Sequence, residues 1–157
     1  MPRPGALLLA AFVVSLAAVG AALVSQHVYD MQPCPWCVLQ RVIFVAIAAA
    51  ALPGLLIRRP WARRTSGVLV GLLALCGMAA ALWQHFVAAS STSCNLTLAD
   101  RIVGGLGLDG LWPEVFAAYA SCADAAVKLV GVSYEFYSLA LYALLGWVAI
   151  QVLRQPR

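Results

Sequence analysis

Four long apolar stretches divide the chain, at residues 5–26, 38–57, 67–89 and 136–153. Each has about 18 to 23 residues and would span roughly 27 to 34 Å as a helix, enough to cross a bilayer core of about 30 Å. In lipid the backbone polar groups must be satisfied within the segment, which favours helices. The pattern therefore predicts an all-α membrane protein with four transmembrane helices.

The segments between these stretches predict a short loop at residues 27–37 and a long one at 90–135, both on the same side of the membrane. Within the long loop, "LTLADRIV" (96–103) has apolar residues at helical spacing, so we expect a short helix on the membrane surface. "GGLGLDGLWP" (104–113) is typical of turns. The following residues 114–130 favour another short helix, with Cys122 within it or at an interruption.

No repeat or low-complexity linker interrupts the sequence, so residues 1–157 are predicted to form a single domain. Short connections favour antiparallel neighbours and hence a four-helix bundle. On the third stretch Gly67 and Gly71, then Gly77 and Ala81, are four residues apart. This spacing either lets helices approach closely or merely reflects how frequent glycine and alanine are here.

The composition agrees with a membrane protein, because 64% of the residues are hydrophobic and only 10% are charged. Soluble domains are usually about a quarter charged. The first stretch is longer than the roughly 7 to 15 apolar residues of a signal peptide core, so we expect it to be a retained span.

The charges separate by side and predict the orientation. Seven of the ten basic residues fall on one side: Arg3, Arg58, Arg59, Arg63, Arg64, Arg154 and Arg157. All six acidic residues fall on the other: Asp30, Asp100, Asp109, Glu114, Asp124 and Glu135. The positive-inside rule then places both termini in the cytoplasm and both loops outside, which in bacteria is the periplasm beyond the inner membrane. The net charge of +4 is thus a topology signal, and no nucleic-acid partner is expected.

Four of the five cysteines, namely Cys34, Cys37, Cys94 and Cys122, fall on the outer side, where disulfides persist. The fifth, Cys76, lies in the middle of the third stretch and is expected to be a small buried apolar residue.

Cys34 and Cys37 form a C-x-x-C at the predicted start of the second helix. Free backbone N–H groups and the helix dipole lower the pKa of a thiol at such a position. Arg41 follows Cys37 by four residues, on the same helix face, and a nearby cation further favours the thiolate. An ionisable residue at the edge of a span is a functional candidate, although Arg41 could instead extend to the interface as an anchor.

Several other interpretations of the cysteines can be weighed. Zinc would need two further ligands, and the distant Cys94 and Cys122 are a weak signal, so no metal is predicted. Covalent haem attachment needs C-x-x-C-H, whereas Val38 follows Cys37. Static disulfides remain open: a Cys94–Cys122 bridge would close a loop of about 28 residues and stabilise by roughly 3.5 kcal/mol.

Two cysteine pairs on one side also suggest an electron relay by thiol–disulfide exchange. The chain has no dinucleotide fingerprint and no haem motif. A lipid-soluble quinone suits the location, because it can reach the helix edge beside Cys37. Arg41 would then stabilise the oxygen of the reduced quinone.

The sequence resembles the bacterial disulfide-bond formation protein B family over nearly its whole length. The resemblance is carried by "CPWCVLQR" (34–41) on the second span, by the long loop with Cys94 and Cys122, and by "LWPEVF" (111–116) ahead of Cys122. The spacing of the C-x-x-C, the arginine and the second cysteine pair is fairly specific.

The resemblance implies a thiol:quinone oxidoreductase that reoxidises DsbA, a periplasmic oxidase of the thioredoxin fold, and passes electrons to ubiquinone or menaquinone. It implies that Cys94 forms the mixed disulfide with this partner, that Cys122 is its pair, and that Cys34 exchanges with the loop pair. Cys37 would contact the quinone as a thiolate beside Arg41. His85 would match a histidine near the quinone, or is simply an interfacial polar residue beside Trp83.

Two rival functions remain. A quinone reductase similar to vitamin K epoxide reductase shares the bundle and the paired cysteines, but its C-x-x-C lies late in the bundle, whereas Cys34 and Cys37 are early. A non-enzymatic membrane organiser with a disulfide-stapled outer loop would need neither Arg41 nor a helix start that favours a thiolate.

Overall fold

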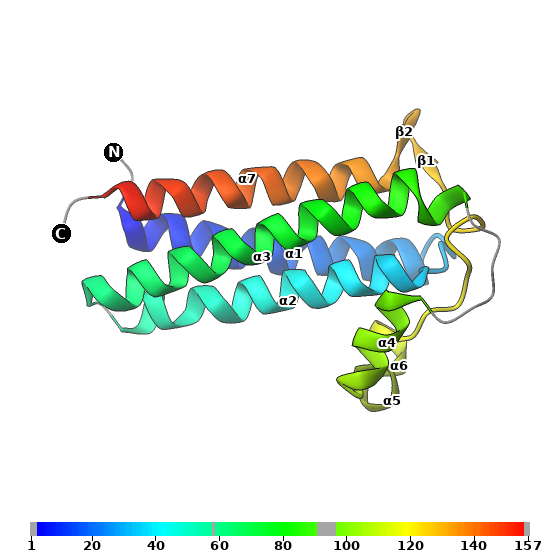
Figure 1. Ribbon diagram of the computed structural model, residues 1–157, viewed down its shortest axis with the longest axis horizontal. Helices are drawn as coiled ribbons and strands as arrows, with labels where there is room; N and C mark the ends of the chain where they lie inside the picture. The colour runs from blue at the N-terminus through cyan, green and yellow to red at the C-terminus, as the bar shows by residue number, and fades with distance from the viewer. Residues whose placement is uncertain (1–2, 58, 91–96, 156–157) are drawn as a thin grey trace.

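A computed structural model of the protein, which describes residues 3–57, 59–90 and 97–155, contains four long helices. They are α1 (Pro4–His27), α2 (Pro35–Leu56), α3 (Pro60–Phe86) and α7 (Tyr134–Arg154). The four lie side by side in an elongated bundle, with the start of α1, the end of α7 and the α2–α3 connection at one end (Figure 1). The predicted all-α membrane fold with four spans is confirmed.

The helix ends differ from the ends of the apolar stretches. α2 begins at Pro35 rather than at residue 38, and α3 covers Pro60–Phe86 rather than 67–89. A proline occupies the first turn of α1, α2 and α3, where its fixed backbone angle suits a helix start and its missing N–H is not needed. Hydropathy marks the part of a helix that lipid can cover, whereas the proline marks where the helix begins.

Small residues bring α3 against α7. A Cβ atom on Gly67 would contact Val152 and Leu153, and one on Gly71 would contact Ala149. On Gly77 it would overlap the ring of Tyr142. Of the two alternatives for the small residues, the structure shows the close helix approach, with α7 as the partner.

A proline inside α2 is accommodated by the neighbouring helix. Pro53 interrupts the backbone hydrogen bonds of α2, and the N–H of Gly54 donates to the Ser66 hydroxyl of α3 at 2.9 Å. A side chain that satisfies freed backbone groups is a common solution in membrane helices.

The bundle exposes apolar side chains on its outer surface. Leu9, Val13, Leu72 and Leu75 are each about half exposed, whereas Ile47, Val70 and Tyr142 are fully buried. Within the described residues, the four long helices are each long and apolar enough to cross a membrane. This arrangement fits a multi-pass membrane protein.

Cys76 is exposed on the outer surface of α3, so the prediction that it is buried is wrong. The buried face of α3 carries Ala74, Gly77 and Ala80, at helical spacing. Cys76 precedes Gly77 by one position and therefore points to a different side of the helix.

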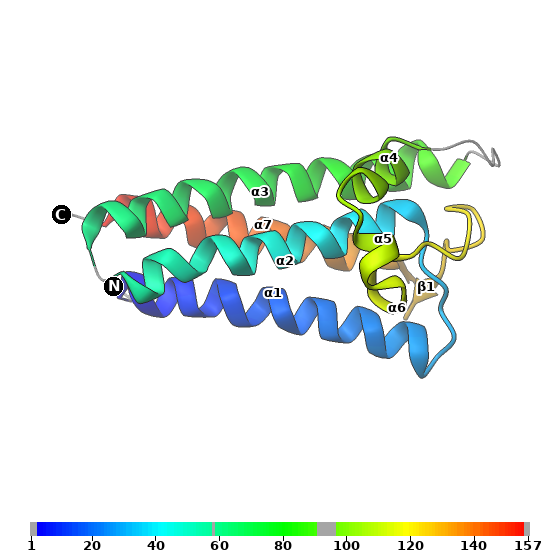
Figure 2. The same cartoon turned by 90° about the horizontal axis from the view of Figure 1, so that it is seen from below.

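The loops gather at the other end of the bundle, beside α2 (Figure 2). They contain the 3₁₀ helix η1 (Ala88–Ser90), the helices α4 (Leu98–Gly105), α5 (Leu108–Leu111) and α6 (Pro113–Phe116), and the strands β1 (Lys128–Leu129) and β2 (Val132–Ser133). The predicted helix near residues 96–103 is confirmed as α4. Thr97 and Asp100 form a capping box at its start. Its buried residues, Ala99 and Val103, belong to the bundle core, and α4 packs against α2.

Two other loop predictions are wrong in part or in full. The turn prediction for residues 104–113 holds at 106–107, where Gly107 has φ of 66°, but Leu108–Leu111 forms the short helix α5. Of the next segment only Pro113–Phe116 is helical. The helix expected over 114–130 is replaced by a non-helical stretch around Cys122 and by the β1–β2 hairpin. Val130 and Gly131 have φ of 53° and 83°, and two left-handed residues in a row are typical of a tight hairpin turn.

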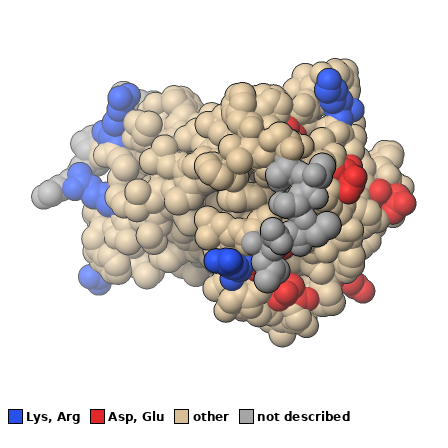
Figure 3. All heavy atoms as spheres, turned by 45° about the vertical axis from the view of Figure 1, so that its right-hand side comes forward, with Lys and Arg blue, Asp and Glu red and all other residues tan. Residues whose placement is uncertain are grey.

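The charges separate along the bundle axis as the sequence predicts. On the face shown in Figure 3, acidic side chains gather at the loop end and several basic ones lie at the opposite end. Arg101 and Lys128 are basic residues of the loop end.

Candidate functional site

The C-x-x-C forms the start of α2. Cys34 is the N-cap, and its sulfur accepts the backbone N–H of Cys37 at 3.3 Å. The two Sγ atoms are 2.8 Å apart. Cys34 has no exposed surface, whereas Cys37 is partly buried and borders a cavity.

Cys122 joins this pair from the long loop. The N–H groups of Tyr119 and Ala120 donate to the carbonyl of Pro33 at 3.0 and 3.2 Å, which fixes the loop beside the C-x-x-C. A thiol hydrogen bond links Cys34 to Cys122, and the N–H of Trp36 donates to the Cys122 sulfur. Cys34 therefore contacts both Cys37 and Cys122. Cys94 lies outside the described residues.

The thiols of Cys34 and Cys122 differ in acidity. The pKa of Cys34 is raised by its hydrogen bonds to Cys122 and Cys37 and by burial. The hydrogen bond from Cys34 lowers the pKa of Cys122, against the opposing effect of burial. For Cys34 these hydrogen bonds and burial outweigh the lowering of the pKa expected at a helix start.

Arg41 is turned into the bundle and is only 5% exposed, so it is not an anchor that extends to the interface. Its guanidinium donates to Gln26 Oε1 of α1 at 2.6 Å and to the Val115 carbonyl of α6 at 3.0 Å. A longer contact of 3.4 Å reaches the Ala22 carbonyl. Arg41 therefore connects α1, α2 and the long loop.

A cavity of about 240 Å³ lies among the four long helices at the loop end. Alanines of α1 form one wall, Phe44 and Leu141 contribute apolar surface, and Cys37 and Arg41 provide a sulfur and a positive charge. Gln40, Gln84, Tyr134 and Glu135 are further polar residues of the lining. A mostly apolar cavity with a few convergent polar groups is typical of a small-molecule site.

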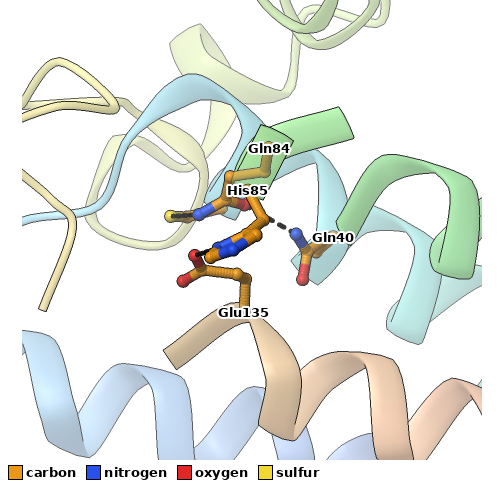
Figure 4. Close-up of polar contacts among 5 residues, drawn as sticks. Gln40, Gln84, His85 and Glu135 are labelled. Atoms are coloured by element: carbon orange, nitrogen blue, oxygen red, sulfur yellow. Dashed lines mark hydrogen bonds and ion pairs between the residues drawn. The ribbon is translucent and has the colours of Figure 1, made fainter. Parts of the chain in front are cut away.

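Two glutamines that sequence reasoning missed form a chain to Cys37. Gln84 Nε2 donates to Cys37 Sγ at 3.3 Å, and Gln84 Oε1 accepts from Gln40 Nε2 at 2.7 Å (Figure 4). Both amides are buried. The available signal was a polar residue inside an apolar helix, which usually indicates an interior partner.

His85 is paired with a carboxylate that the sequence did not suggest. Its Nδ1 lies 2.6 Å from Glu135 Oε1, and its ring contacts Phe86 and Phe136. Glu135 lines the cavity, whereas His85 lies behind it with 31% of its side chain exposed. The neighbouring Trp83 faces Trp36, with ring centroids 6.3 Å apart. Contact between His85 and a quinone stays a prediction.

Comparison with known proteins identifies the family. Residues 4–152 match the sequence model described as disulfide bond formation protein DsbB. The chain belongs to the DsbB family. It is 35% identical over 161 aligned positions to disulfide bond formation protein B 1 of Pseudomonas aeruginosa, covering 99% of this chain and 98% of the relative. Disulfide bond formation protein B of Aromatoleum aromaticum is 31% identical, over 97% of this chain and 93% of that protein. A homologue from Pseudomonas syringae pv. syringae is 38% identical over 84% of this chain and 79% of its own length.

Membership in the DsbB family supports a role in disulfide bond formation. The region matched by the DsbB model includes Cys34, Cys37, Cys122 and the whole lining of the cavity. A mechanism must therefore account for the three sulfurs, for Arg41 and for the cavity.

Proposed function

We propose that this DsbB-family protein is a thiol:quinone oxidoreductase of the bacterial inner membrane. It would reoxidise a periplasmic DsbA-like oxidase of the thioredoxin fold and pass the electrons to ubiquinone or menaquinone. The observation that supports this most is the position of Cys34 between Cys122 of the loop and Cys37, which borders the cavity with Arg41.

The residues around the cavity fit a quinone ring. Apolar side chains of α1, α2 and α7 would cover its faces, and Arg41 would stabilise a reduced oxygen. When bound, a quinone accepts two electrons and two protons. Cys37 would contact it as the thiolate, with the Gln84 amide donating to the sulfur.

The proposed steps between Cys122, Cys34 and Cys37 use the contacts of these sulfurs, and the steps at Cys94 rest on the resemblance to the family. A thiolate of the reduced partner attacks the Cys94–Cys122 disulfide at Cys94, which forms a mixed disulfide and releases Cys122. The second thiolate of the partner then attacks the partner sulfur of this mixed disulfide. The partner leaves with its own disulfide, and Cys94 and Cys122 are left as two thiols. Cys122, as the thiolate, then attacks Cys34 of a Cys34–Cys37 disulfide and releases the Cys37 thiolate. Attack of Cys94 on Cys122 restores the loop disulfide, and Cys34 and Cys37 hold the two electrons as a dithiol.

The proposed orientation follows from the charges. The Arg-rich end would face the cytoplasm together with both termini, and the loop end would face the periplasm. The reduced partner would then reach the loop end of the bundle from the periplasm, and the quinone would reach the same end from the lipid.

Turnover of the purified protein tests the function. Protein in lipid nanodiscs is mixed with reduced DsbA-like partner and a short-chain ubiquinone or menaquinone, and partner oxidation and quinol formation are followed together. We expect one quinol per partner disulfide, and loss of both signals in Cys37→Ser. A folded protein that forms neither product would instead support the alternative of a non-enzymatic membrane organiser.

A further inference from the structure

We propose that Glu135 is the proton donor to the quinone in the cavity and that His85 resupplies Glu135 from the loop end of the bundle. This inference rests on the proposed quinone function. It assigns a catalytic role to a carboxylate in the first turn of α7 and a positioning and relay role to the histidine behind it.

Glu135 and His85 together connect the cavity to the surface. Glu135 is 5% exposed and lines the cavity that Cys37 and Arg41 also border. Its Oε1 atom lies 2.6 Å from His85 Nδ1, close enough for direct proton transfer. His85 comes from the last turn of α3, and the two side chains meet between α3 and α7 (Figure 4). The side chain of His85 is 31% exposed on the outside of the bundle, in the last turn of α3 at the loop end.

The other groups around Glu135 are poorer donors. Arg41 keeps its protons throughout the working pH range. The hydroxyl of Tyr137 is already donated to the Leu129 carbonyl at 2.8 Å. Cys37 is the electron donor, and Tyr134 is the remaining titratable side chain of the lining. The wall from α1 contributes alanines and Ser25, and β1 contributes Leu129.

The proton count requires such a route. Closing the Cys34–Cys37 disulfide supplies two electrons and releases two protons, and forming quinol takes up two electrons and two protons. Glu135 gives a proton to a quinone oxygen and becomes a carboxylate. Imidazolium His85 then returns a proton from Nδ1 to Glu135 and is itself reprotonated from water. Two such proton transfers complete the reduction of the quinone. The two protons taken up by the quinone equal the two released by the thiols, so no net proton is consumed.

The first test is a single turnover of prereduced protein with a short-chain ubiquinone at a series of pH values. We expect quinol formation in Glu135→Gln to be about a hundredfold slower, since general acid catalysis is typically worth 10² to 10⁴. Equilibrium binding of the quinone should change less than about threefold, because a neutral amide of the same shape replaces the acid. The dependence of the rate on pH should differ between the wild type and Glu135→Gln, because the amide has no proton to transfer to the quinone.

Matched variants separate this role from a structural one. Glu135→Asp should restore part of the rate, because it restores the carboxyl. Glu114→Gln, which makes the same change at an exposed position on α6, should behave as the wild type. A Tyr134→Phe variant that loses the rate while Glu135→Gln keeps it would overturn the proposal.

A second test needs no quinone. The infrared band of the Glu135 carboxyl group, identified by its absence in Glu135→Gln, is compared between the wild type and His85→Gln. We expect His85→Gln to displace this band, because His85 Nδ1 lies 2.6 Å from Glu135 Oε1. A band that His85→Gln leaves in place, or a Glu135→Gln variant with a normal rate of quinol formation, refutes the inference while leaving the quinone function intact. A wild type that reduces no quinone under any condition refutes both.

Discussion

Replacement of Arg41 by methionine separates two jobs that one guanidinium performs. The side chain borders the cavity beside Cys37, and it also donates to Gln26 and to the Val115 carbonyl of the long loop. Methionine keeps the apolar stem and removes the charge. The variant should therefore weaken the quinone site and loosen the attachment of α6.

The size of each effect follows from the contacts. One charge-assisted hydrogen bond is worth roughly 1.5 to 3 kcal/mol, so loss of the contact to a quinone oxygen should raise the quinone KM by roughly ten- to a hundredfold. The contacts to Gln26 and Val115, at 2.6 and 3.0 Å, are the two short ones in the free protein. Their loss leaves a buried amide and a carbonyl without this donor, which should lower the free energy of unfolding by about 2 to 4 kcal/mol.

Quinone-dependent turnover is measured across quinone concentration, and hydrogen exchange of residues 113–120 reports on the loop. Arg41→Lys should rescue the KM in part, because lysine restores the charge without the planar fork. Gln26→Leu is the matched control, since it removes the partner at 2.6 Å and keeps the charge. It should loosen α1 while changing the KM by less than about threefold.

An unchanged KM in Arg41→Met would refute the assignment of Arg41 to the quinone. Equal rises in KM for Arg41→Met and Gln26→Leu would show that Arg41 acts only by holding the structure together.

Three further outcomes are expected. Cys94→Ser should abolish oxidation of the soluble partner, while chemically prereduced protein still forms quinol in a single turnover; a normal rate of partner oxidation would contradict the order of transfer. Cys34→Ala should raise the pKa of Cys122 back toward the ordinary thiol range, because the hydrogen bond that most lowers it is gone. Alkylation of Cys122, followed by mass spectrometry against pH, should then shift to higher pH, and an unshifted profile would disprove the thiol contact. Gly77→Ala should destabilise the protein by about 1 to 3 kcal/mol, since the added Cβ overlaps an aromatic ring of α7. Gly20→Ala, which has open space, is the control in thermal unfolding, and equal stability of the two variants would argue against the close helix contact.

The spans were predictable because membrane thickness sets a minimum length for any apolar helix. Burial of Cys76 was predicted wrongly for a related reason: lipid accepts apolar groups on every side of a helix, so an apolar position in a span does not reveal which way it faces. The loop was less predictable, since short helices such as α5 depend on packing that local sequence does not specify.

The functional site, like the fold, was predictable from the sequence only in part. Spacing alone indicated the C-x-x-C and Arg41 as a unit, because four residues make one helical turn. It could not show that Cys122 lies against Cys34, since that contact depends on how residues 117–122 cross the bundle end. The partnership of His85 with Glu135, 50 residues away in sequence, likewise becomes visible only when α3 and α7 are brought together.

The complete burial of Cys34 also bears on selectivity against unwanted reductants. A sulfur with no exposed surface cannot be attacked by a low-molecular-weight thiol in the surrounding solution, whatever the difference in redox potential. Only a sulfur of the same chain, already held beside it, can exchange with it. Exchange at Cys34 is thus restricted by steric exclusion to neighbouring sulfurs of the chain, whereas the less buried Cys37 borders the cavity and is the sulfur that a small molecule can reach.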